Sequence, residues 1–275
     1  MPEQDWTGRT MVMSGGSRGI GLAIALGAAK RGANVVLLAK TGEPDPRLPG
    51  TVHTAAAEIE AAGGHAHAVV GDVRSEEDVQ RAIDEGVQRF GGIDFCVNNA
   101  SAINLLGTVE LPVKRFDLMQ QVNVRGTFLL TRACVPHLRN ASNPHILTLS
   151  PPIGLKPEWL GGHPAYTLSK YGMSLLTLGW ATEFQSDKIA ANCLWPRTII
   201  ATAAVQNLLG GDEAMARSRT PEIVADAAVE ILSRPSTEAT GNTYIDTDVL
   251  AEAGITDLSK YGGGTELATD LFVEG

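Results

Sequence analysis

Short apolar segments alternate with longer helical segments along most of this 275-residue chain. The alternation is typical of a parallel sheet whose strands are joined by crossover helices. It predicts an α/β chain with a single-domain Rossmann fold: a doubly wound parallel sheet of about seven strands, with helices on both faces. One domain is expected to span residues 1–275, with residues 247–275 forming a C-terminal tail.

The predicted strands cover residues 10–13, 34–39, 67–70, 93–97, 145–149, 189–194 and 242–245. The predicted helices cover residues 19–31, 51–62, 76–90, 118–138, 166–184 and 222–232. Three prolines predict an irregular loop over residues 41–49, after the second strand.

Composition excludes several classes of partner. A formal net charge of −9 argues against nucleic acid and anionic membranes, since both attract basic surfaces. No apolar run reaches the roughly 18 residues that a membrane-spanning helix needs, and the short acidic start is unlike a leader peptide. Cys96, Cys134 and Cys193 are isolated, which favours reduced thiols in a cytoplasmic protein, and no Cys/His spacing predicts a metal site.

A glycine-rich turn stands between the first predicted strand and the first predicted helix. Gly15, Gly19 and Gly21 have the spacing G-x-x-x-G-x-G. Glycine permits a tight turn and close backbone approach, and the helix N-terminus offers free N–H groups to a pyrophosphate. This position favours dinucleotide binding over a plain structural turn. The expected cofactor contacts in the turn are Ser14, Gly15, Ser17, Arg18, Gly19, Ile20 and Gly21.

The end of the second predicted strand indicates which dinucleotide is bound. A carboxylate there would hold a ribose 2′-hydroxyl and repel a 2′-phosphate. The chain instead has Lys40, which together with Arg18 can converge on a phosphate. We therefore expect NADP(H) rather than NAD(H), although two solvated surface cations are the alternative.

Tyr166 and Lys170 lie four residues apart in a predicted helix, so their side chains share one face. A free tyrosine has a pKa near 10. A lysine charge about 4 Å away favours the phenolate by roughly 4 kcal/mol at an effective dielectric near 20. This would bring the tyrosine pKa to about 7, as acid–base catalysis at neutral pH requires.

In this order, these motifs resemble the short-chain dehydrogenase/reductase family over about residues 8–250. The resemblance implies that Asp72 and Val73 hold adenine and that Asn99 and Ala100, in Asn98-Asn99-Ala100, contact the cofactor. It also gives roles to the residues at five further positions. Asn123 would anchor a water in a proton relay, Lys170 would hold the nicotinamide ribose, and the remaining cofactor contacts would be Pro196, Ile199 and Thr202.

Three segments resemble one branch of the family, the hydroxysteroid dehydrogenase-like proteins. They are Lys40-Thr41-Gly42-Glu43-Pro44, Ser150-Pro151-Pro152 and Leu194-Trp195-Pro196. Members of that branch often carry a C-terminal sterol-carrier domain, and none is expected in this sequence.

One position departs from the family pattern. The family has a serine after the fifth strand that binds the substrate oxygen, and alignment places Pro151 there, with Ser150 one residue early. Proline has neither a hydroxyl nor an N–H to donate. The chain could bulge so that Ser150 still reaches the oxygen, Tyr166 could hold it alone, or Ser150 could merely end the strand. Losing one such donor typically costs about 3 kcal/mol, or about a hundredfold in rate.

The sequence therefore predicts an NADP(H)-dependent enzyme that transfers hydride between nicotinamide and a small-molecule carbonyl or alcohol, with Tyr166 moving the proton. The resemblance implies a homotetramer or homodimer built through the helices at 118–138 and 166–184. Two alternatives remain: a dinucleotide-binding regulatory protein with weakened catalysis, and a dehydratase or isomerase on the same scaffold.

Overall fold

A seven-stranded parallel sheet runs through the protein in the order β3-β2-β1-β4-β5-β6-β7. The structure is a computed structural model that describes residues 5–45, 49–208, 210–264 and 266–274. The strands are β1 (Thr10–Ser14), β2 (Asn34–Ala39), β3 (His65–Val70), β4 (Phe95–Asn98), β5 (His145–Leu149), β6 (Ala190–Trp195) and β7 (Thr243–Ile245). The direction in which successive strands are added reverses between β1 and β4. In sheets of this kind, ligands bind beyond the carboxyl ends of the strands at this switch point. The predicted doubly wound fold is confirmed.

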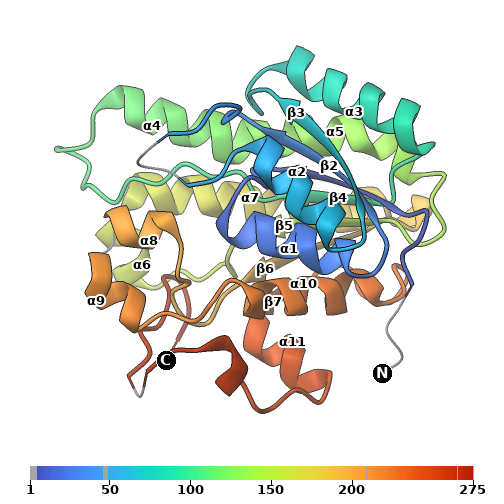
Figure 1. Cartoon of the computed structure of the whole chain (residues 1–275). Helices are drawn as coiled ribbons and strands as arrows, with labels where there is room; N and C mark the ends of the chain where they lie inside the picture. The colour runs from blue at the N-terminus through green and yellow to red at the C-terminus, as the bar shows by residue number, and fades with distance from the viewer. Residues whose placement is uncertain (1–4, 46–48, 209, 265, 275) are drawn as a thin grey trace.

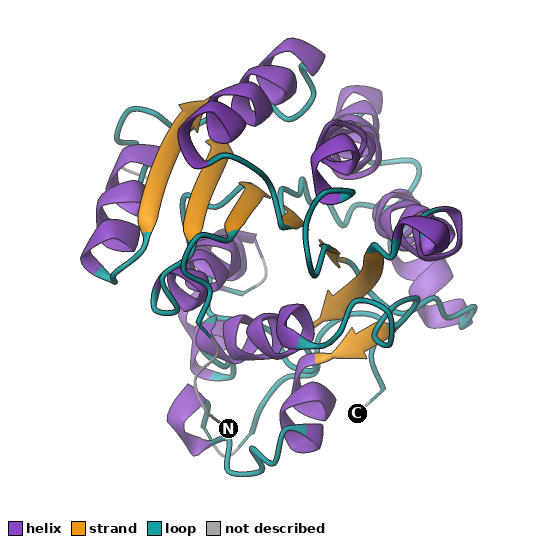
Figure 2. Cartoon of the chain, turned by 90° about the vertical axis from the view of Figure 1, so that its right-hand side faces the viewer, coloured by secondary structure: helices purple, strands orange, loops and turns teal. Residues whose placement is uncertain are grey.

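Helices cover both faces of the sheet (Figures 1 and 2). One face carries α1 (Gly19–Ala29), α2 (Val52–Ala61), α10 (Glu222–Ser233) and α11 (Asp246–Glu252). The other carries α3 (Glu76–Phe90), α5 (Gly126–Leu138) and α7 (Pro164–Glu183). Four shorter helices lie near the carboxyl ends of the strands: α4 (Val113–Met119), α6 (Pro157–Gly162), α8 (Ala203–Leu208) and α9 (Gly211–Ala216).

The helix predicted over residues 118–138 is longer and less regular than expected. It begins with α4 after Pro112, passes through a π-helical segment, η1 (Gln120–Arg125), and continues as α5. Single π-helical turns inside α-helices often occur at functional sites. This one carries Asn123, a predicted site residue.

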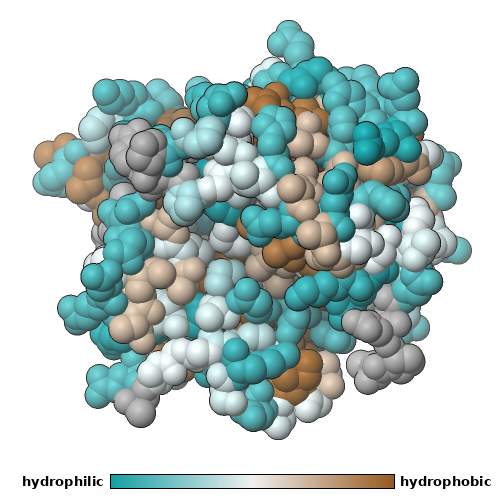
Figure 3. Space-filling model, in the orientation of Figure 1, coloured by the Kyte–Doolittle hydropathy of each residue, from teal (hydrophilic) through white to brown (hydrophobic). Residues whose placement is uncertain are grey.

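Most of the described surface drawn in Figure 3 is hydrophilic, with apolar side chains protruding beside α4. Val109 and Val113 are the main exposed apolar residues of this region, at 91% and 74% exposure. None of the helices in the described part of the chain combines the length and the apolar composition that a bilayer-spanning helix needs.

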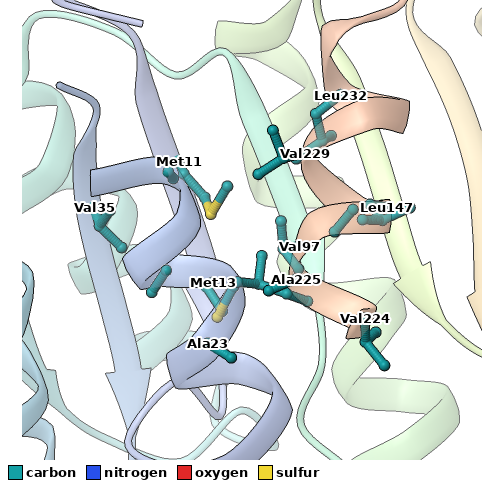
Figure 4. Close-up of a cluster of buried hydrophobic side chains, with 14 of the residues drawn as sticks. Met11, Met13, Ala23, Val35, Val97, Leu147, Val224, Ala225, Val229 and Leu232 are labelled. Carbon is teal, nitrogen blue, oxygen red and sulfur yellow. The ribbon is translucent and has the colours of Figure 1, made fainter. Parts of the chain in front are cut away.

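The larger part of the core lies between the sheet and helices α1 and α10. Met11 and Met13 of β1 face Val229 and its neighbours on α10 (Figure 4). Full burial of a side chain of this size contributes roughly 1.5–3 kcal/mol relative to exposure. Because β1 is central and buried on both faces, the turn that follows it is held in a fixed place.

Candidate active site

The turn after β1 is tied to the turn after β4 by hydrogen bonds. Ser14 Oγ accepts from the backbone N–H groups of Asn99 (3.3 Å) and Ala100 (3.2 Å). Asn99 Nδ2 donates to the carbonyl oxygens of Ser14 (3.2 Å) and Gly15 (2.9 Å). The structure therefore brings together four of the predicted cofactor residues, at the switch point of the sheet.

The glycine turn fits a dinucleotide because side chains are excluded from it. Gly15 has φ +74°, and a Cβ there would come within 2.9 Å of Ala100 Cα. A Cβ on Gly21 would come within 2.4 Å of Asn99 Nδ2. The first turn of α1 can thus present its backbone N–H groups directly to a phosphate.

Arg18 stands immediately before α1 and donates from Nη2 to the carbonyl of Gly50 (2.9 Å). Its Nε is buried without a hydrogen-bond partner in the described structure. An unpartnered guanidinium donor beside a helix N-terminus is suited to an anionic group. Of the other predicted contacts here, Ser17 is buried and Ile20 is half-buried.

Lys40 and Asp72 follow the neighbouring strands β2 and β3 and lie together. Lys40 Nζ is 3.3 Å from Asp72 Oδ2, and the lysine side chain is 64% exposed. Arg74 also binds Asp72, at 2.6 Å from Nη2, and it is the main cause that holds the pKa of this carboxyl well below its usual range. Within the described residues no hydrogen bond or ion pair joins Lys40 to Arg18. Val73 is buried against Gly126 of α5.

Tyr166 and Lys170 project from the N-terminal half of α7 and are almost fully buried, at 4% and 3% exposure. Lys170 Nζ donates to the carbonyl of Leu149 at the end of β5 (2.9 Å). It also lies 5.1 Å from the centre of the Trp195 ring, within the range of a cation–π contact. These contacts fix the ammonium at the carboxyl end of the sheet.

The predicted lowering of the Tyr166 pKa is not found in this arrangement. Burial raises the pKa of Tyr166, and the carboxylate of Asp270 adds to the increase. Burial lowers the pKa of Lys170 to about 7, which Asp270 partly opposes. The pKa of Asp270 is raised to about 7, mainly by burial and further by Asp246. The helical spacing correctly places the pair on α7, but it carries no information on burial or on a distant carboxylate.

Asn123 is fully buried in η1, and its side chain forms hydrogen bonds to two other described residues. Its Oδ1 accepts from the Ala102 N–H (2.7 Å), and its Nδ2 donates to the Ala102 carbonyl and to Ser169 Oγ (both 2.9 Å). Ser169 Oγ in turn donates to the Tyr166 carbonyl (2.8 Å). Asn123 thereby connects the loop after β4 to the turn of α7 that carries Tyr166.

Ser150 is fully buried, and its hydroxyl lies near the thiol of Cys193 on β6. Two residues earlier on the same side of β5, Thr148 bonds Thr177 of α7 (2.7 Å). Within the described residues no hydrogen bond joins Ser150 to Tyr166. The carbonyl of Pro151 accepts from Ser174 of α7 (2.6 Å), which holds the chain close to the helix at this point.

Pro196, Ile199 and Thr202 lie on the segment after β6. Pro196 is buried, and Thr202 reaches the glycine turn, since a Cβ on Gly19 would lie 3.3 Å from its Cγ2. Ile199 lines a cavity of about 360 Å³. The other lining residues are Leu105, Gly210, Glu213, Ala214, Arg217, Ala268, Thr269, Asp270 and Leu271.

Residues 270–272 lie at the site although no sequence motif pointed to them. Trp195 Nε1 donates to the Leu271 carbonyl (2.7 Å), and Phe272 is 1% exposed beside Tyr166. His163, one residue before α7, is 8% exposed, and burial lowers its pKa. The apolar run Leu271-Phe272-Val273 near the end of the tail is a signal that indicates a buried contact.

Known proteins match both the sequence and the fold. The model of the short chain dehydrogenase family matches residues 9–211, and the chain belongs to this family of oxidoreductases. It is similar to hydroxysteroid dehydrogenase-like protein 2 from Danio rerio, with 53% identity over 270 residues, and from Homo sapiens, with 49% over 269 residues. These alignments cover 98% and 97% of this chain, and the chain spans 64% of the length of both relatives.

Solved structures share this fold as well. A short-chain dehydrogenase from Mycobacterium thermoresistibile has a TM-score of 0.93 and 58% identity, over 98% of this chain and 96% of that chain. L-sorbose reductase from Gluconobacter frateurii, solved with NADPH and L-sorbose, has a TM-score of 0.76 and 28% identity, over 88% and 96% of the two chains.

Proposed function

We propose that this chain is an NADP(H)-dependent oxidoreductase acting on a carbonyl or alcohol substrate. The observation that carries the proposal is the position of Tyr166 and Lys170, at the carboxyl ends of the strands and on the same edge of the sheet as the glycine turn. NADPH, when bound, supplies the hydride that reduces the carbonyl carbon. The protein binds both molecules, orients them and transfers the proton.

The backbone of the glycine turn would hold the pyrophosphate, Arg18 together with Lys40 the 2′-phosphate, and Asp72 and Val73 the adenine. For NADP(H), Lys40 is the residue of interest, because it stands at the end of β2 where a carboxylate would favour NAD(H). The Lys40 side chain is 64% exposed in its ion pair with Asp72, so the pair is weak and Lys40 can rearrange toward a 2′-phosphate. The similar L-sorbose reductase was solved with NADPH.

Tyr166 would donate its phenolic proton to the substrate oxygen during reduction and accept it during oxidation. A positioned acid of this kind typically accelerates a reaction by about 10²- to 10⁴-fold. Lys170 would stabilise the phenolate and hold the nicotinamide ribose, with its ammonium fixed by Leu149 and Trp195. Asn123 would act as a positioning residue through Ser169 and as the anchor of the relay water.

Ser150 has the weakest claim among the proposed catalytic residues. Its hydroxyl is buried near Cys193. We propose that Tyr166 holds the substrate oxygen without Ser150, which would slow the enzyme by about a hundredfold relative to a site with both donors. The same feature favours the second candidate function, a dinucleotide-binding regulatory protein with weakened catalysis.

The surface near the site suggests an apolar substrate and self-association. Leu106 and Val109 are exposed on the loop that also carries Leu105, a residue of the cavity wall. On α7, Leu168 and Leu175 are 56% and 61% exposed, and such faces suit packing against a second copy. We propose a homodimer or homotetramer in a reducing compartment such as the cytoplasm, where the three buried cysteines stay as thiols.

A substrate screen that follows NADPH absorbance tests the proposed function. We expect oxidation of NADPH with at least one of the small aldehydes, acyl ketones or steroid ketones, and abolition of that activity in Tyr166→Phe. Product formation without NADPH oxidation would instead indicate a dehydratase or isomerase. Dinucleotide binding with no product from any compound would favour the regulatory alternative.

A further inference from the structure

The segment 266–274 lies across the site and pairs with the loop after β6. Ile199 N–H donates to the Ala268 carbonyl and Asp270 N–H to the Arg197 carbonyl, both at 3.0 Å. Ala268 N–H donates to the Arg217 carbonyl, also at 3.0 Å. These partners belong to loops and short turns rather than to the strands of the sheet. The segment can therefore leave without breaking any pairing within the seven-stranded sheet, and among the described residues only the isolated antiparallel bridge between Thr198 and Thr269 is lost.

Phe272 inserts its ring into a box of four other rings. The ring centres of Tyr171, His163, Trp195 and Tyr166 lie 5.4, 5.6, 6.1 and 6.2 Å from that of Phe272. We call these four rings the aromatic box. Phe272 has φ +68°, a backbone conformation that bulky residues rarely adopt. The burial of the ring therefore holds the backbone in an unfavourable conformation.

The ring of Phe272 covers the proposed proton donor. A substrate oxygen must come within roughly 2.6–3.2 Å of the Tyr166 hydroxyl to receive its proton. Tyr166 is 4% exposed, and the Phe272 ring, itself 1% exposed, lies 6.2 Å from the Tyr166 ring, so the docked segment contributes to closing this side chain off from solvent. The cavity of about 360 Å³ beside the box is itself walled by residues 268–271 of the same segment.

The charge that the segment brings also opposes catalysis. Asp270 raises the pKa of Tyr166, so the phenolate that accepts a proton during alcohol oxidation is disfavoured while the segment is docked. Lys170 is the cation facing Asp270, and Asp246 is the other carboxylate near it. While segment 266–274 is docked, Phe272 limits access to Tyr166 and Asp270 disfavours the Tyr166 phenolate. Both effects oppose catalysis in this arrangement.

We propose that the aromatic box is the subsite for the apolar, ring-bearing part of the substrate, and that segment 266–274 is a gate whose Phe272 ring occupies this subsite until the substrate displaces it. This inference rests on the proposed function, because it takes Tyr166 as the proton donor. It identifies the substrate class as carbonyl compounds with a compact hydrocarbon ring system. Such a group can replace the contacts that Phe272 makes with four aromatic rings.

Binding of a bicyclic ketone, 2-decalone, tests the gate without requiring turnover. Calorimetric titration into the full chain with saturating NADP⁺ would be compared for wild type, Phe272→Ala and the neighbouring control Val273→Ala. We expect the dissociation constant of 2-decalone to fall roughly tenfold in Phe272→Ala, because a competing ring is removed. It should change less than about twofold in Val273→Ala.

Hydrogen exchange gives the second readout. Saturating 2-decalone should accelerate exchange of the Ala268 and Asp270 amides in wild type, because both lose their carbonyl partners when the gate opens. Slower or unchanged exchange, weaker binding in Phe272→Ala, or no binding by either protein would overturn the gate. Faster exchange with no turnover of any carbonyl would support the gate and refute the proposed enzymatic function.

Discussion

Replacing Gly21 by alanine should damage the cofactor turn in a way that can be worked out from the structure. The new Cβ would lie 2.4 Å from Asn99 Nδ2 and 2.7 Å from the Gly15 carbonyl oxygen, so Asn99 must move. Movement breaks its hydrogen bonds to Ser14 and Gly15. Each bond contributes about 0.5–1.5 kcal/mol, and overpacking costs about 1–3 kcal/mol. The free energy of unfolding should therefore fall by roughly 2 to 6 kcal/mol.

Urea denaturation measures this loss, and calorimetry measures NADPH binding. Because Asn99 ties the two turns that would hold the cofactor, we expect the NADPH dissociation constant to rise at least about tenfold, equivalent to about 1.4 kcal/mol. Gly92→Ala is the matched control, since a Cβ there meets nothing within 4 Å. If Gly21→Ala and Gly92→Ala showed equal stability and equal NADPH affinity, the proposed role of this turn would be refuted.

Three further substitutions address the cofactor preference, the gate charge and the serine. Lys40→Ala should weaken NADPH binding at least about tenfold more than NADH binding in parallel titrations. Equal losses of affinity would contradict a contact between Lys40 and the 2′-phosphate. The pKa of Asp270 is raised from 3.8 to about 7, so the folded protein favours the protonated carboxyl. The stability that this carboxyl contributes to the folded state is fully present below pH 4 and is lost as pH rises through 7. Asp270→Asn should therefore slow amide exchange in residues 266–274 at pH 8 relative to wild type, and an unchanged rate would contradict this linkage. Ser150→Ala should change kcat/KM less than about threefold in NADPH oxidation assays, and a hundredfold loss would return Ser150 to the catalytic site.

Elements with strong local signals could be predicted from the sequence to the residue. Helix α3 begins after Ser75, whose side chain accepts from the Asp78 N–H, and ends at Gly91 with φ +88°. Strands β2 and β5 are mostly apolar and are buried along their whole length, and their predicted limits are also correct. Capping and burial are encoded within a few residues, which explains this accuracy.

The remaining parts depend on contacts between distant segments. Helices α8 and α9 have six residues each, too few for a periodic pattern to appear. The contact of Phe272 with Tyr166 joins the tail to α7, and no local signal specifies it. For the same reason, the spacing of Tyr166 and Lys170 placed both on one helix but gave the wrong direction for the tyrosine pKa. Residues 46–48, within the predicted irregular loop, lie outside the described residues.

The central claim is that Tyr166 transfers a proton in an NADPH-dependent reduction. Tyr166→Phe keeps the ring in the aromatic box and removes only the hydroxyl, so fold and NADPH affinity should be retained. Measured by NADPH oxidation with the best carbonyl substrate, kcat should fall by at least about 10²-fold while the dissociation constant of NADPH changes less than about threefold. An unchanged kcat in this variant would contradict the assignment of the active site.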